Sequence, residues 1–168
     1  MNKLGSKFSR HAQHRRRVLS GLAALSVLPA LAWAAGTTKA TQPVRVEVWK
    51  DPACGCCKDW IDHLRASGFD VRAHETGNAA AREKLGMPER YGSCHTASVG
   101  GYAIEGHVPA REVRRLLREK PVAIGLAVPA MPVGSPGMDG PEYGARRDPY
   151  DVLLVRRNGS SLVFQSYR

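Results

Sequence analysis

The stretch VRVEVWKDPACGCC, residues 44–57, decides the fold class because it joins a strand pattern to a cluster of three cysteines. Its first half alternates apolar and polar side chains, which is the period of a half-buried strand. Beyond it, apolar residues recur at helical spacing until Gly68 ends the helix. We therefore expect a strand that delivers Cys54, Cys56 and Cys57 to the N-terminus of a helix.

The residues after Gly68 predict further strands and helices. They predict a strand at 69–73, a helix at 79–85 capped by Asn78, strands at 96–99 and 102–104 across Gly100-Gly101, and a last helix from Pro109. A βαβ unit followed by a ββα unit is the thioredoxin arrangement. We predict an α/β, thioredoxin-like domain over residues 44–120, with another small α/β sandwich as the alternative.

Residues 121–168 are predicted to form a C-terminal extension of this domain. Met, Pro and Gly dominate residues 128–141, which indicates a loop. Strand patterns at 151–156 and 162–167 flank Asn158-Gly159, a dipeptide typical of hairpin turns. The extension is therefore expected to be a Met/Pro/Gly loop followed by a β-hairpin.

The N-terminus has the pattern of an export signal. Its first 34 residues carry six basic and no acidic residues, an apolar run at 18–31 and then Ala32-Trp33-Ala34. The run is shorter than the ~20 residues of a membrane span. We predict a signal peptide over 1–34, a flexible lead-in over 35–43, a periplasmic location and no membrane span after cleavage. Arg15-Arg16-Arg17 also resembles a twin-arginine signal, with general secretion as the alternative route.

Charge and length narrow the class of protein further. Without residues 1–34 the net charge falls from +10 to +4, with 19 basic and 15 acidic residues. These charges are interspersed and form no basic patch with aromatics, which argues against a nucleic-acid partner. The remaining 134 residues fit one domain. No apolar heptad is present, so we expect a monomer.

Four cysteines in an exported chain ordinarily predict two disulfides. Here, however, three of them lie within four residues, where a cross-link closes almost no loop. At a helix N-terminus the pKa of such thiols is expected to fall, and thiolate is the form that binds metal. Cys54 and Cys57 also keep the C-x-x-C spacing of thiol–disulfide oxidoreductases, which is the alternative function. A purely structural pair of disulfides is a third interpretation.

Four more residues are candidate ligands. Cys94 and His95 occupy the loop before the third strand, which in thioredoxin-like proteins lies beside the first helix and usually carries proline. Met131 and Met138 lie in the Pro- and Gly-rich loop, where packing in a helix or strand core is not expected. The alternatives are a structural or disulfide-bonded Cys94, a hydrogen-bonding His95, and methionines that cover an apolar patch. His107 is a weaker candidate.

Ligand softness then selects the metal. Thiolates and thioethers favour copper(I), whereas zinc usually takes paired C-x₂₋₄-C knuckles and is the second choice. The predicted ligands are Cys54, Cys56, Cys57, Cys94, His95, Met131 and Met138. We expect a protein that sequesters copper, with several copper(I) ions sharing sulfurs, or that interconverts copper(I) and copper(II). No catalytic residue is assigned from the sequence.

Three segments together resemble a known family. They are VEVWKDPACGCCKDWIDHLRASGFDV (46–71), SCHTASVGGYAIEGHVPAREVRRLL (93–117) and GLAVPAMPVGSPGMDG (125–140). They are similar to the CopG-like periplasmic copper-resistance proteins, which carry a C-x-C-C motif, and the resemblance spans residues 44–167. It implies a thioredoxin-like domain whose extension contributes to a copper site, a role in copper tolerance, and periplasmic copper-efflux components as partners. It also implies that the seven candidate ligands belong to that site.

Overall fold

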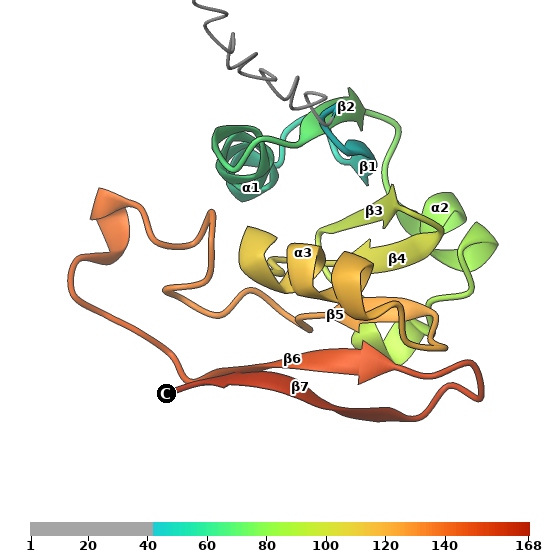
Figure 1. The fold of residues 1–168 in the computed structure, drawn as a ribbon. Helices are drawn as coiled ribbons and strands as arrows, with labels where there is room; N and C mark the ends of the chain where they lie inside the picture. Colours follow the sequence, from blue (N-terminus) through green and yellow to red (C-terminus); the bar gives the residue numbers. More distant parts are fainter. Residues whose placement is uncertain (1–41) are drawn as a thin grey trace, which may run out of the picture. The chain divides into compact units, whose positions relative to one another are not determined.

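The computed structural model describes residues 42–168, so the predicted signal peptide and most of the lead-in lie outside the described residues. Within this range seven strands form one mixed sheet, in the order β2-β1-β3-β4-β5-β6-β7 (Figure 1). The strands are β1 (Arg45–Lys50), β2 (Asp70–His74), β3 (His95–Val99), β4 (Tyr102–Glu105), β5 (Gly125–Ala127), β6 (Tyr150–Val155) and β7 (Ser161–Tyr167). The helices are α1 (Gly55–Ala66), α2 (Ala79–Lys84) and α3 (Ala110–Glu119), with short 3₁₀ turns η1 (Glu89–Tyr91) and η2 (Pro141–Tyr143). None of the helices in residues 42–168 combines the length and the apolar character that a membrane crossing needs.

The first four strands have the predicted thioredoxin arrangement. β1 and β2 run parallel and are connected by α1, while β3 lies antiparallel to β1 on its other side. β4 is antiparallel to β3, and α3 follows it. The predicted α/β class and the βαβ-ββα order are confirmed.

Helices pack on both faces of the sheet because successive strand residues point to opposite sides. In β4, Ile104 belongs to the main core with Trp60 of α1 and Leu116 of α3. Its neighbour Ala103 belongs to a second cluster with Met87, which follows α2. Figure 1 accordingly shows α2 on the opposite side of the sheet from α3.

The C-terminal extension continues the same sheet. The predicted hairpin is present as β6 and β7, each beginning one residue earlier than expected. β5 was not predicted, since three residues are too few to display a period. It pairs parallel with β4 and antiparallel with β6, and so joins the hairpin to the thioredoxin-like strands.

Asn78 corrects one local expectation. It occupies the N-cap position of α2, as predicted, but its side chain makes no capping hydrogen bond. The Asn78 Nδ2 instead donates to the Ser93 carbonyl at 3.1 Å and to the Thr96 Oγ1 at 3.2 Å. The residue therefore ties the start of α2 to the loop that carries Cys94.

Candidate metal centre

The three motif cysteines lie where β1 ends and α1 begins. Cys54 occupies the N-cap position of α1, and Cys57 in the first turn is fully buried. Asp51 shapes the connecting turn: its Oδ1 accepts the Ala53 N–H at 2.8 Å, and its carbonyl accepts the Cys54 N–H at 3.0 Å. The loop therefore stands at a helix N-terminus, as the sequence predicts.

Two of the four cysteines are bonded to each other and two are free. Cys54 and Cys57 form a disulfide, whereas Cys56 and Cys94 remain thiols. The Cys56 Sγ lies 3.6 Å from the Cys54 Sγ and 3.9 Å from the Cys94 Sγ. All four sulfurs fall within 4.8 Å of one another. The structural interpretation with two disulfides does not describe this arrangement.

Cys94 is the point where the sulfur cluster meets two imidazoles. Its Sγ lies 3.1 Å from the His107 Nε2 and 3.5 Å from the His95 Nδ1. Burial, reinforced by the neighbouring Cys56, raises the pKa of the Cys94 thiol to about 12. The metal-free thiol is therefore protonated at neutral pH, and an arriving metal ion has to displace that proton.

His107 is the ligand candidate that the predicted set leaves out. It is fully buried, and its Nδ1 lies 2.8 Å from the Pro136 carbonyl. A carbonyl only accepts, so Nδ1 carries the proton and Nε2 presents its lone pair toward Cys94. Burial lowers the pKa of His107, which keeps the imidazole in the neutral form that binds metals.

The hairpin register already contains the signal for His107. Thr96 pairs with Glu105, and Val99 pairs with Tyr102, across the predicted Gly-Gly turn. Continuing this register by two residues beyond Thr96 places Cys94 opposite His107. The two residues are therefore paired when the predicted hairpin is extended in this register.

His95 is buried deeper than the thiols. Its ring packs on Trp60 with centroids 4.2 Å apart and meets His107 edge-on at 5.0 Å. Burial holds the pKa of His95 well below its usual range. Within residues 42–168, its Nε2 is the one buried side-chain nitrogen or oxygen that has no hydrogen-bond partner. The hydrogen-bonding alternative therefore accounts for only one of its two nitrogens.

The two candidate methionines differ in their surroundings. Met131 is 48% exposed, and its Sδ lies 4.0 Å from the Cys56 Sγ. Met138 is buried, and its Sδ accepts the Tyr143 hydroxyl at 3.5 Å. Met131 is thus placed beside a free thiol, whereas Met138 is a buried residue of the same loop with a protein partner for its sulfur.

Two other histidines have structural partners. The His63 Nε2 accepts the Ala110 N–H at the start of α3, at 3.1 Å. The His74 Nε2 lies 2.7 Å from a carboxylate oxygen of Glu47, and its ring stacks on Trp49. Each therefore acts in packing between elements: His63 joins α1 to the start of α3, and His74 joins β2 to β1.

A family model and two solved structures are similar to this chain. A family model described as "Protein of unknown function, DUF411" matches residues 91–138. Two solved structures, titled "Copper resistance protein copG- Form 2" and "Copper resistance protein copG- Form 1", are each 46% identical to this chain with a TM-score of 0.69. The alignments cover 75% and 74% of this chain, and 99% and 98% of the respective structures. The chain belongs to the CopG-like copper-resistance family. No curated protein matches it.

In this CopG-like chain the family model covers one of the two parts of the chain that form the cluster. The matched segment 91–138 contains Cys94, His107 and Met131, while the motif cysteines precede it. The site is therefore assembled from two parts of the chain, the β1–α1 loop and this segment. Such an assembly forms only when the thioredoxin-like sheet is folded.

A shallow cavity of about 440 Å³ opens beside Cys94 and Met131. It is also lined by Arg82, Glu89 and Ser93. Cys94 and Met131 both line this opening, so two residues of the cluster border on a cavity that is open to solvent.

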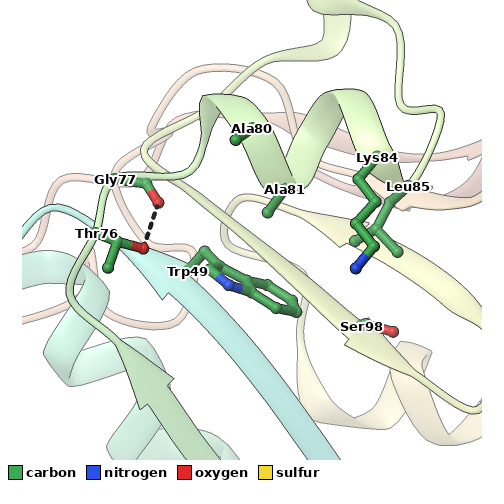
Figure 2. A pocket seen from close by; sticks show the side chains of 8 residues that line it. All are labelled: Trp49, Thr76, Gly77, Ala80, Ala81, Lys84, Leu85 and Ser98. Carbon is green, nitrogen blue, oxygen red and sulfur yellow. Dashed lines mark hydrogen bonds between the residues drawn. The ribbon is translucent and has the colours of Figure 1, made fainter.

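A second cavity of similar volume, about 470 Å³, lies between α2 and the sheet (Figure 2). Figure 2 shows the Trp49 indole beneath α2, with Ala81 and the Lys84 side chain above it. Its lining contains no cysteine or methionine among the described residues. This cavity of the CopG-like protein is thus chemically distinct from the thiol cluster.

Proposed function

We propose that this protein contributes to copper resistance by binding copper, as copper(I), at the cysteine cluster. The proposal rests on four soft or borderline ligands that lie close together: two thiols outside the disulfide, one thioether and one imidazole. The Cys56 Sγ lies 3.9 Å from the Cys94 Sγ and 4.0 Å from the Met131 Sδ, and the His107 Nε2 lies 3.1 Å from the Cys94 Sγ. His95 adds a buried imidazole whose Nδ1 lies 3.5 Å from the Cys94 Sγ and whose Nε2 has no hydrogen-bond partner.

The donor set supports copper(I) over zinc. Two thiols, an imidazole and a thioether form a soft set, and thioether sulfur favours copper(I). Zinc sites take thiolate, imidazole or carboxylate ligands, so the Met131 thioether is the ligand that distinguishes the two metals. Reduction of Cys54–Cys57 would add two more thiolates beside Cys56, so that several copper(I) ions could share sulfurs. Zinc remains the second metal to test.

Once reduced to the dithiol, the Cys54–Cys57 pair also provides an electron source for copper redox chemistry. Two copper(II) ions would each accept one electron from the Cys54 and Cys57 thiolates, which join as a disulfide and leave two copper(I) ions. The Cys54 Sγ is 3.6 Å from the Cys56 Sγ, so the copper(I) formed is next to a free thiol. An external dithiol would restore the Cys54 and Cys57 thiols. This step is an oxidoreductase activity toward copper, and copper is its substrate.

The predicted signal peptide supports action in the periplasm. Copper that enters from outside the cell would meet the cluster there, and copper-efflux components would be the receiving partners. The expected state of the protein in this compartment is a monomer.

A thiol–disulfide oxidoreductase is the second candidate function. The observation in its favour is the Cys54–Cys57 disulfide at the thioredoxin position. Cys56 and Cys94 count against it, because two further thiols beside the pair invite competing disulfides. Insulin reduction at a rate comparable to that of a thioredoxin would favour this second function.

Counting bound metal tests the proposal. The reduced protein would be loaded with copper(I), or with zinc as a control, without oxygen and under a competing chelator, followed by elemental analysis. We expect more than one copper ion per chain, and loss of copper in a Cys56→Ser, Cys57→Ser double variant. Met131→Leu should weaken retention, whereas Met87→Leu, in the buried cluster near α2, should not. Equal copper uptake by the parent and the double variant would overturn the proposal.

A further inference from the structure

Glu105, the last residue of β4, is a fully buried carboxylate. Its Oε1 accepts the Ser93 N–H at 2.7 Å and the Arg82 Nε at 3.0 Å. The Arg82 Nη2 lies 2.9 Å from the same oxygen, and the Oε2 accepts the Thr96 hydroxyl at 2.6 Å. Ser93, Arg82 and Thr96 each donate to the carboxylate, so protein groups take the place of water around its negative charge.

Arg82 also binds the loop that contains Ser93 and Cys94. Its side chain is 8% exposed, and its Nη2 also donates to the Ser93 carbonyl at 2.8 Å. Ser93 thus has its N–H bound to Glu105 and its carbonyl bound to Arg82. Both main-chain groups of the residue before Cys94 are fixed by this one ion pair.

The same ion pair is linked to the other ligand-bearing segments. Glu105 is two residues before His107, and its carbonyl accepts the Val128 N–H at 2.9 Å, where the Met/Pro/Gly loop begins. The Ser93 hydroxyl donates to the Ala130 carbonyl at 2.7 Å, next to Met131. The ion pair and its immediate neighbours therefore hold the backbone next to Cys94, His107 and Met131.

A buried ion pair is a poor source of net stability, because desolvating the two charges offsets most of their attraction. Its geometric consequence is the stronger reason for its place in this fold. We propose that Glu105 and Arg82 form a positioning pair that holds Cys94 toward Cys56 and His107 for metal capture. This inference rests on the proposed copper-binding function.

The chemistry of the carboxylate makes Glu105→Gln the informative variant. Glutamine keeps the volume but removes the charge, and its amide NH₂ cannot accept from Arg82 or the Ser93 N–H as a carboxylate oxygen does. The Thr96 hydroxyl is the one neighbour that could accept from it, and that oxygen already accepts from the Asn78 Nδ2. Changes to groups that orient a metal ligand without touching the metal weaken metal affinity by about 10- to 100-fold. Thr96→Val is a milder variant that removes one donor and leaves the ion pair intact.

Glu112 provides a matched control. Glu112 lies on α3, and its side chain is 4% exposed. It accepts hydrogen bonds from the Arg111 Nε and from the Tyr167 hydroxyl, each at 2.8 Å. Glu112→Gln therefore disrupts a second buried carboxylate whose partners are not ligand candidates. Any general loss of stability should occur in both glutamine variants.

Two measurements on the full chain decide the question. The first is copper(I) affinity by chelator competition, which we expect to fall about 10- to 100-fold in Glu105→Gln, less in Thr96→Val, and not in Glu112→Gln. The second is the iodoacetamide alkylation rate of Cys94 in the metal-free protein. We expect this rate to rise most in Glu105→Gln, less in Thr96→Val, and not in Glu112→Gln. If Glu105→Gln does not fold, Thr96→Val against Glu112→Gln decides.

The proposal is overturned if Glu105→Gln, or Thr96→Val in its place, matches Glu112→Gln in both measurements. A parent that binds no copper would instead refute the proposed function. The alkylation rates would then still decide whether the pair positions Cys94, so the two failures are distinguishable.

Discussion

Replacing Gly137 with alanine should displace the Met/Pro/Gly loop from helix α1. Gly137 has a φ of +84°, and an added Cβ would lie 2.6 Å from the Cys56 carbonyl oxygen and 2.8 Å from the Trp60 amide nitrogen. Both atoms belong to the backbone of α1, so neither can rotate away. The positive φ costs about 1–2 kcal/mol for an alanine, and the steric overlap adds about 1–3 kcal/mol.

Gly101 separates these two contributions. Its φ is +85°, and a Cβ there would meet no atom within 4 Å. Gly101→Ala should therefore lower the free energy of unfolding by about 1–2 kcal/mol, from conformation alone. Gly137→Ala should lower it by about 2–5 kcal/mol, because the overlap is added. Urea denaturation of both variants measures the difference.

Copper affinity gives the functional side of the same comparison. The loop carries Met131 and the Pro136 carbonyl that orients His107, so its displacement disturbs two ligands. A coupling of about 1–3 kcal/mol corresponds to a loss of about 5- to 150-fold in copper(I) affinity. Chelator competition should show this loss for Gly137→Ala and none for Gly101→Ala. Equal affinities in the two variants would refute the assignment of this loop to the site.

The remaining predictions concern His107, Cys94 and Trp60. His107→Ala should weaken copper(I) binding at least about tenfold, whereas His63→Ala should leave it unchanged; equal affinities in chelator competition would contradict the ligand role of His107. Because the pKa of the metal-free Cys94 thiol is about 12, protons compete with copper at neutral pH, and affinity measured from pH 8 to 6 should fall by up to about tenfold per unit; a flat profile would exclude proton displacement there. Trp60→Phe leaves the buried Val108 carbonyl, 2.9 Å from the indole Nε1, without its donor and should destabilise the protein by about 1–3 kcal/mol in urea, with an unchanged midpoint as the contrary result.

The sequence predicted the parts of the fold that depend on local periodicity. The alternating residues of β1, the helical spacing after Cys57 and the Gly-Gly turn each specify an element whose position was confirmed. β5 was missed because its existence depends on neighbouring strands rather than on a pattern in Gly125–Ala127. Short strands of this kind are determined by tertiary pairing.

The candidate site was predictable where residue type alone indicates chemistry. Four cysteines and a methionine-containing loop indicate soft ligands, and the structure brings Met131 to Cys56. The disulfide state could not be read from spacing, because Cys54 and Cys57 fit both a redox pair and a metal site. The Glu105–Arg82 pair lay beyond sequence reasoning, since its charges are 23 positions apart and meet only in the folded core.

The most direct test of the account is X-ray absorption at the copper K edge of the protein loaded with copper(I) without oxygen. We predict an edge position of copper(I), a first shell dominated by sulfur, and a nitrogen contribution that decreases in His107→Ala. A first shell of nitrogen and oxygen alone would contradict it, because the cysteine cluster would then not be where copper binds.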